Sequence, residues 1–192
     1  MDSVLKKYVE FTKKWEGGLS KDKSDSASKF PCPTPYKGIS GYHTNIGITY
    51  AVWSNFYGKD KDQRFFEMTA EEWFKVFKTL YWNQVKADEF KSINVAIFVT
   101  GMAWGSGKTQ AIKSLQQALI NCGVLKKEDK DGIIGNKTIA AANSLSPRVL
   151  FDALVEERRR FFNIIGRPNS KNNKFLKGWL NRLNDYVKQF RP

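Results

Sequence analysis

The residues best suited to chemistry lie in the stretch Trp15-Glu16-Gly17-Gly18, where a carboxylate ends an amphipathic segment and two glycines follow it. Apolar residues recur at helical spacing through residues 4–15, which predicts a helix that stops at the glycines. Glu16 then lies at the negative end of the helix dipole beside an apolar indole, and both surroundings disfavour its charged form. General acid catalysis near neutral pH requires such a carboxyl group. A surface glutamate at a frayed helix end is the alternative interpretation.

Further oxygen-bearing side chains follow Glu16. Asp22 and Asp25 lie in a polar segment, and Thr44 and Thr49 occur in the run His-Thr-Asn-Ile-Gly-Ile-Thr-Tyr. An acid that faces a second oxygen-bearing group across a cleft can hydrolyse a glycosidic bond, with retention at about 5–5.5 Å and inversion at about 6.5–9.5 Å between carboxyl groups. The sequence does not supply this distance, so both outcomes stay open. The two aspartates are equally suited to turns or helix caps.

Other features of the sequence limit the kinds of catalysis and the kinds of partner that can be expected. The chain has no glycine-rich phosphate loop, no catalytic triad and no spacing typical of a metal site, so neither a cofactor nor a metal is expected. Its formal charge of +13 favours a polyanionic partner such as nucleic acid, anionic lipid or an acidic cell wall. No nucleic-acid motif accompanies the charge, and no nucleic-acid partner is expected. Two cysteines do not make a disulfide framework, and no apolar run is long enough to span a bilayer.

Helical patterns dominate, and the predicted fold is mostly α. A polar segment with three prolines, from Ser20 to about Thr44, is predicted to be a long functional loop. The apolar run 93–104 is predicted to be a buried helix, with a strand over 95–99 as the alternative. Further helices are predicted from a capping box at Thr69 through Tyr81, around 112–122, up to Ala142, from Ser146-Pro147 to Ile165, and over 176–190. Two domains are predicted, 1–106 and 107–192. The boundary between them is approximate, and the two parts can also pack as one compact unit.

Several motifs in combination resemble a known family. Glu16-Gly17-Gly18-Leu19 with Asp22, then Gly41-Tyr-His-Thr-Asn-Ile-Gly-Ile-Thr49 and Tyr81-Trp-Asn-Gln-Val-Lys-Ala-Asp88, are similar to motifs of glycoside hydrolase family 108. These are lysozyme-like N-acetylmuramidases of phages and bacteria, and some are called secretion activators. The runs 115–119, 131–138 and 157–162 resemble the predicted peptidoglycan-binding module that usually follows.

This resemblance implies a lysozyme-like helical domain with a long active-site loop, packed with a C-terminal helical module. It implies a peptidoglycan hydrolase of endolysin type that cleaves the β-1,4 bond between N-acetylmuramic acid and N-acetylglucosamine, with Glu16 as general acid. The candidates to assist it are Asp22, Asp25, Thr44 and Thr49, and the candidates to contact the glycan are Tyr50, Trp53, Trp104 and His43. For the aromatic residues, core packing is the alternative. We expect a monomer, made in the cytoplasm without a signal peptide, that reaches the wall by holin-type or other non-classical release.

The sequence departs from the family pattern at three places. The loop between Asp22 and Thr44 is longer than usual and contains Cys32, and Tyr42 replaces the second glycine of a Gly-Gly pair. Gly101 and Gly105 replace an aspartate and an asparagine. These departures motivate a second hypothesis, a catalytically impaired wall-binding or secretion-associated protein of the same fold. A basic nucleic-acid binder is a third hypothesis, which rests on charge alone.

Overall fold

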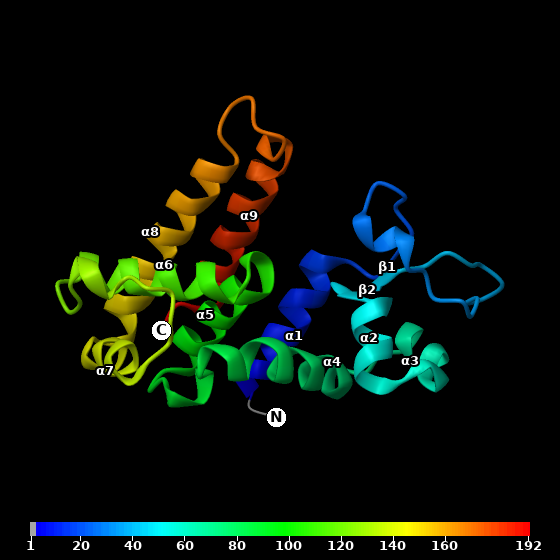
Figure 1. The fold of residues 1–192 in the computed structure, drawn as a ribbon, viewed down its shortest axis with the longest axis horizontal. Coiled ribbons are helices and arrows are strands. Elements are labelled where there is room, and N and C mark those ends of the chain that lie inside the picture. The colour runs from blue at the N-terminus through cyan, green and yellow to red at the C-terminus, as the bar shows by residue number, and fades with distance from the viewer. Residues whose placement is uncertain (1–2) are drawn as a thin grey trace. The chain divides into compact units, whose positions relative to one another are not determined.

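The structure is a computed structural model that describes residues 3–192, and it divides into two compact units, Met1–Lys78 and Thr79–Pro192. Helices dominate both units, and the described strands form one small sheet in the first unit (Figure 1). The prediction of a mostly α fold is therefore confirmed. Among the described residues, no helix is both long enough and apolar enough to cross a membrane.

From residue 3 to residue 78 the structure describes four α-helices, of which α1 and α4 form much of the core of the first unit. The helices are α1 (Ser3–Glu16), α2 (Tyr50–Tyr57), α3 (Asp62–Phe66) and α4 (Ala70–Phe77). Tyr8 of α1 packs its ring against Phe77 at 5.4 Å between centroids and against the edge of Trp73. The predicted capping box is present, because the Thr69 and Glu72 side chains each bond the other residue's backbone N–H. These contacts fix α1, and with it the position of Glu16 at its end.

A three-stranded antiparallel sheet follows α1, and the sequence analysis did not predict it. Its strands are β1 (Leu19–Ser20), β2 (Thr44–Asn45) and β3 (Ile48–Thr49), in the order β1-β2-β3. Two-residue strands are too short to show an alternating pattern. The turn between β2 and β3 places Ile46 at φ 47° and Gly47 at φ 74°, which is the combination of a tight type I′ hairpin.

The helix predicted to run from Thr69 through Tyr81 is shorter than expected. The α-helical part ends at Phe77, and a π-helical turn follows over Lys78–Trp82. A π turn advances five residues rather than four, so the next buried ring after Phe77 is Trp82, while Leu80 is exposed. The 3.6-residue period used for the prediction does not detect such a local widening.

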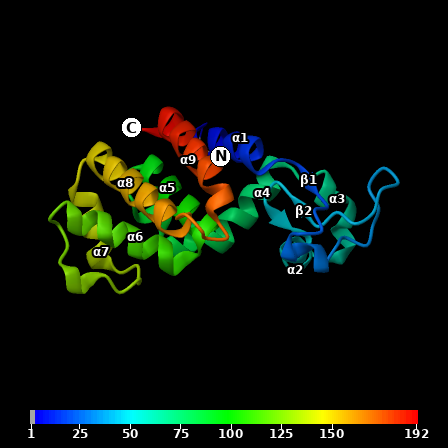
Figure 2. The same cartoon turned by 90° about the horizontal axis from the view of Figure 1, so that it is seen from above.

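The α-helices of the second unit pack as a bundle (Figure 2). They are α5 (Ile93–Ser106), α6 (Lys108–Asn121), α7 (Asn136–Ser144), α8 (Pro147–Ile165) and α9 (Asn173–Phe190). The strand alternative over 95–99 is wrong, because these residues lie in the middle of α5. Ser92 caps α5, and Ser146 with Pro147 opens α8 as predicted.

Helix α5 packs against both α6 and α8, so residues 79–106 belong by contact to the C-terminal bundle. Gly107, at φ 81°, ends α5 and directly precedes α6. A single left-handed glycine thus joins two packed helices at the place where the sequence analysis drew its domain boundary. Whether 1–106 and 107–192 are separate domains stays a prediction.

The C-terminus is fixed to the bundle by polar contacts. The Arg191 guanidinium donates two hydrogen bonds to the Asp152 carboxylate of α8, and this contact lowers the pKa of Asp152. The Asn94 side chain donates to the backbone carbonyl of Phe190 at 2.6 Å. These contacts hold the end of α9 against α5 and α8.

Candidate functional site

Glu16 is the last residue of α1 and is half-buried. The next residue, Gly17, has φ 70°, a left-handed conformation that is strained for residues with a Cβ. Strand β1 begins two residues later at Leu19. The two glycines therefore turn the chain directly from the helix into the sheet, and the Glu16 carboxyl group lies at this junction.

The sheet register aligns three hydroxyl side chains. Ser20 pairs with Thr44, and Thr44 pairs with Thr49. Directly paired residues project to the same face of a sheet, so these three side chains share one face, and all are half-exposed. Asn45 and Ile48 project to the opposite, buried face. The first unit thus carries a row of hydroxyl groups on the strand that follows Glu16 and on its two neighbours.

Thr44 and Thr49 have different roles in this row. The Thr49 hydroxyl accepts a hydrogen bond from the Val52 backbone N–H and caps α2. The Thr44 hydroxyl instead lies 3.0 Å from Nδ1 of His43. Thr49 therefore positions a helix, whereas Thr44 is oriented by an imidazole.

His43 is 1% exposed and joins two parts of the site. Its Nε2 lies 3.1 Å from the backbone carbonyl oxygen of Asp22, and a carbonyl only accepts hydrogen bonds, so Nε2 carries a proton. In the neutral ring Nδ1 is then an acceptor, and the Thr44 hydroxyl donates to it. The lone pairs of the Thr44 oxygen remain as acceptors on the side away from the imidazole.

The two aspartate candidates are both exposed. Asp25 caps the short 3₁₀ turn Ser26–Lys29, because its Oδ1 accepts from the Ala27 backbone N–H at 2.9 Å. Asp22 forms a similar turn with Ser24, whose N–H donates to Oδ1 at 2.8 Å. Both carboxylates therefore order the start of the long loop. Only Asp22 is also joined to Thr44 through the His43 ring.

The loop from residue 20 to residue 44 is irregular but well anchored. The Cys32 backbone N–H donates to Tyr42 O at 2.8 Å, and the Cys32 side chain is buried. The Tyr36 ring stacks on Phe66 of α3 at 4.9 Å between centroids. The Thr34 hydroxyl donates to Asp62 at 3.0 Å. These contacts hold the loop against α3 and leave Phe30 and Ile39 among the exposed apolar side chains.

Three of the four residues predicted to contact the glycan lie in the core. Trp53 is fully buried, and its indole N–H donates to Lys61 O at 3.2 Å. Tyr50 is buried and donates a short hydrogen bond to the Asp62 carboxylate, and both burial and this bond raise its pKa. His43 is buried as described above. Their burial favours core packing, the alternative given for the aromatic residues, because a buried ring presents little surface to a sugar.

Trp104, the fourth of these residues, belongs to the second unit. It is half-exposed, and its ring lies 5.0 Å from that of Tyr81. In the first unit, Trp15 and Tyr42 are half-exposed rings near the candidate site in sequence, and neither was predicted to contact the glycan. The position of Trp15 directly before Glu16 was the signal that could have identified one of them.

Residues 3–192 contain no group of three or more His, Cys, Asp or Glu side chains that could hold a metal ion. Cys32 and Cys122 are both free thiols.

Comparison with known sequence families assigns both parts of the chain. Residues 9–107 match Glycosyl hydrolase 108, and residues 110–184 match the Predicted Peptidoglycan domain. The chain belongs to glycosyl hydrolase family 108. The two matches together make it a glycoside hydrolase that acts on peptidoglycan.

A solved structure supports the fold of this family 108 hydrolase. The structure of Brucella abortus SagA matches it with a TM-score of 0.67, and the match covers 97% of this chain and 92% of the SagA chain. The identity is 24%, so the likeness shows a shared fold. Comparison with curated proteins found no match.

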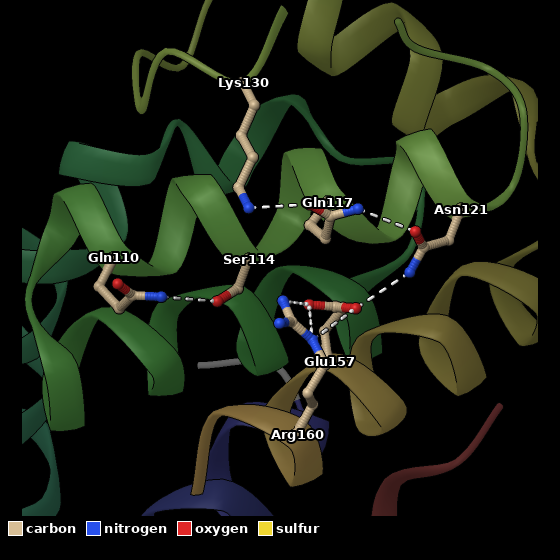
Figure 3. Close-up of polar contacts among 7 residues, drawn as sticks. All are labelled: Gln110, Ser114, Gln117, Asn121, Lys130, Glu157 and Arg160. Carbon is tan, nitrogen blue, oxygen red and sulfur yellow. Dashed lines mark hydrogen bonds and ion pairs between the residues drawn. The ribbon is translucent and has the colours of Figure 1, made fainter. Parts of the chain in front are cut away.

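In the family 108 hydrolase, the peptidoglycan-binding region contains a polar network between α6 and α8 (Figure 3). Glu157 is buried and accepts hydrogen bonds from Arg160 and from Asn121. Asn121 in turn accepts from Gln117, and Gln117 accepts from Lys130. The Asn121–Glu157 hydrogen bond joins α6 to α8, so the network braces these two helices against each other.

Proposed function

We propose that the protein is an N-acetylmuramidase that cleaves the β-1,4 bond between N-acetylmuramic acid and N-acetylglucosamine, with Glu16 as general acid. The observation that carries the proposal is the junction of α1 and β1, where a well-packed helix ends at Glu16 and a strand of the hydroxyl-bearing sheet face begins three residues later. A carboxyl group fixed by the scaffold can protonate the leaving glycosidic oxygen.

Thr44 is the best candidate to position the attacking water. With a neutral His43 ring the Thr44 proton is directed to Nδ1, so the Thr44 oxygen can accept a hydrogen bond from water and aim the water's lone pairs at the sugar carbon. Asp22, whose backbone is bonded to the same imidazole, is the candidate to accept the water's proton. Attack by water predicts inversion, whereas direct attack by Asp22 predicts retention. The anomeric configuration of the first product, measured by NMR, distinguishes the two routes.

The direct test replaces Glu16 by glutamine. Glu16→Gln removes the acidic proton with little change in shape, and we expect release of reducing ends from purified sacculi to fall at least about 100-fold. The matched control is Glu10→Gln, the same change at an exposed position of the same helix that pairs with Lys13. Both variants should keep the wild-type circular dichroism spectrum. Equal wall clearing by Glu16→Gln and wild type would contradict the assignment.

The scissile bond has its own test. Borohydride reduction of the digested wall followed by mass spectrometry identifies the sugar at each new reducing end. Reduced muramic acid is the expected product, and reduced glucosamine would instead indicate a glucosaminidase.

The departures at Gly101 and Gly105 favour a second candidate function, that of a wall-binding protein with impaired catalysis. A Cβ at Gly105 would lie 3.0 Å from Nη2 of Arg158, whose Nη1 donates to Ser106 at 2.7 Å. Gly105 therefore gives Arg158 room to brace the end of α5, which a larger residue would restrict. Binding to sacculi without release of reducing ends would support this candidate.

A further inference from the structure

The end of the α8–α9 hairpin has an unusual charge. From Arg158 to Asn184 the sequence contains no Asp or Glu. The same segment contains eight basic residues, which are Arg158, Arg159, Arg160, Arg167, Lys171, Lys174, Lys177 and Arg182. The segment covers the last part of α8, the connecting loop and much of α9. A large share of the net charge of +13 is therefore concentrated in one hairpin.

The cations nearest the loop are those with no anionic partner. Near the base of the hairpin, Arg159 pairs with Glu156 and Arg160 pairs with Glu157. Four exposed cations toward the loop form no ion pair within the described chain, and they are Arg167, Lys171, Lys174 and Lys177. Their charge is thus available to an external anion.

Large apolar side chains are exposed in the same place. Ile164 is 50% exposed and Phe175 is 49% exposed. The Phe175 ring lies 5.9 Å from that of Trp179, which stacks on Phe162 at 5.3 Å and remains half-exposed. The hairpin end therefore combines unpaired cations with aliphatic and aromatic surface.

We propose that the hairpin end, residues 164–177, docks on an anionic lipid surface. Unpaired cations attract the headgroups, and exposed Ile and Phe side chains can enter the boundary between headgroups and acyl chains. An acidic polysaccharide or nucleic acid would be attracted by the cations, but it would not bury an aliphatic side chain such as Ile164. In Figure 1 the loop between α8 and α9 extends away from α5 and α6, which leaves this end accessible within the second unit. This docking is independent of the reaction proposed for Glu16.

The first test is co-sedimentation of the full chain with vesicles. Vesicles of 70% phosphatidylcholine and 30% phosphatidylglycerol should bind the protein, and vesicles of pure phosphatidylcholine should bind it at least about tenfold more weakly. Equal binding to both, or binding to neither, would overturn the proposal. Glu16→Gln should bind as the wild type does, which separates this proposal from the catalytic one.

The second test removes the charge in two matched ways. The triple variant Lys171→Gln/Lys174→Gln/Lys177→Gln should weaken binding about 100-fold, because each lysine near an anionic bilayer contributes a factor of about five. The control removes three exposed lysines elsewhere, Lys59→Gln/Lys127→Gln/Lys188→Gln, and has the same net charge. An equal effect of the two triple variants would show that only net charge matters and would overturn a docking site at the hairpin end.

The third test examines the exposed apolar side chains of the hairpin end. The double variant Ile164→Ser/Phe175→Ser keeps all charges, and we expect it to abolish the vesicle binding that remains at 0.5 M NaCl, where charge attraction is screened. Unchanged binding of this variant would overturn insertion into lipid. The Lys171/Lys174/Lys177 variant could instead lose binding to purified sacculi or DNA while its vesicle binding stays intact. That result would also overturn the proposal, and it would assign the surface to an anionic polymer.

Discussion

At the residue scale, the buried imidazole of His43 is the group that connects the parts of the candidate site. It bonds the Asp22 backbone through Nε2 and the Thr44 hydroxyl through Nδ1. Residues 21 positions apart in the sequence are thereby held in one arrangement. We interpret His43 as a positioning residue, since its burial prevents contact with the substrate.

Three substitutions separate the two contacts of His43. His43→Phe removes both and is expected to lower kcat about 10- to 100-fold, because misplacing an attacking water by about 1 Å has an effect of that size. His43→Gln can keep a donor near the Nε2 position, and His43→Asn can keep an acceptor near the Nδ1 position, so each should recover part of the activity. The measurement is kcat and KM on soluble glycan fragments, with the melting temperature as a parallel readout. A Phe variant with lowered stability and wild-type kcat would show that the role is only structural.

The sequence identified single residues better than it identified their surroundings. Glu16 could be proposed because its signal is local: a helical run, a carboxylate and two glycines. The role of His43 could not be predicted, because it depends on a tertiary contact with the carbonyl of Asp22. The burial of Trp53 could not be predicted either, since an aromatic residue in a short helix has the same pattern whether it contacts the core or a sugar.

At the scale of elements, the β2–β3 hairpin holds Thr44 and Thr49 opposite each other at the cost of an unfavourable conformation. Ile46 adopts φ 47°, which is strained for a β-branched side chain. The surrounding structure stabilises it, since the Trp73 indole N–H donates to Ile46 O at 3.0 Å. Such strain is common where a functional group must be held in place.

Ile46→Asn should relieve this strain. Asparagine tolerates the left-handed region, so we expect a gain of about 1 kcal/mol in stability, which corresponds to a rise of about 2–4 °C in the melting temperature. The matched control is Ile39→Asn, the same change at an exposed loop position without positive φ. The control should not stabilise the protein. A lower melting temperature for Ile46→Asn would show that the isoleucine's packing outweighs its strain.

The long helices were predicted from the sequence, whereas the short strands and the π turn were not, and each outcome has a physical reason. Long helices with capping residues were recognised, because Ser146-Pro147 and Thr69 with Glu72 mark helix starts locally. The two-residue strands were missed because their pairing depends on partners up to 26 residues apart, as for Leu19 and Asn45. The π turn was missed because it breaks the period on which the prediction relied.

At the scale of the whole molecule, the family matches and the contacts divide the chain at different places. The matched regions meet between residues 107 and 110, whereas compact packing separates the chain after Lys78. The difference concerns α5, which lies in the hydrolase match but packs against α6 and α8. Sequence alone placed the boundary at a glycine-rich joint and had no access to these contacts.

Two fragments test which boundary describes folding. The fragment 79–192 contains α5 and should unfold cooperatively on heating. The fragment 107–192 lacks α5 and would expose the faces of α6 and α8 that pack on it, so we expect no cooperative transition and binding of a hydrophobic dye. Differential scanning calorimetry and dye fluorescence provide the comparison. Cooperative unfolding of 107–192 would instead support the boundary predicted from the sequence.

The buried Cys32 has a consequence for the chemical durability of the protein. Its side chain is 2% exposed beneath the long loop, and burial raises the pKa of its thiol, so little of the reactive thiolate is present. An oxidant can reach this sulfur only when the loop opens. Partial burial also raises the pKa of the Cys122 thiol, but Cys122 is half-exposed and would be oxidised first. The loop anchored by Cys32 can therefore keep its shape in oxidising surroundings without a disulfide bond.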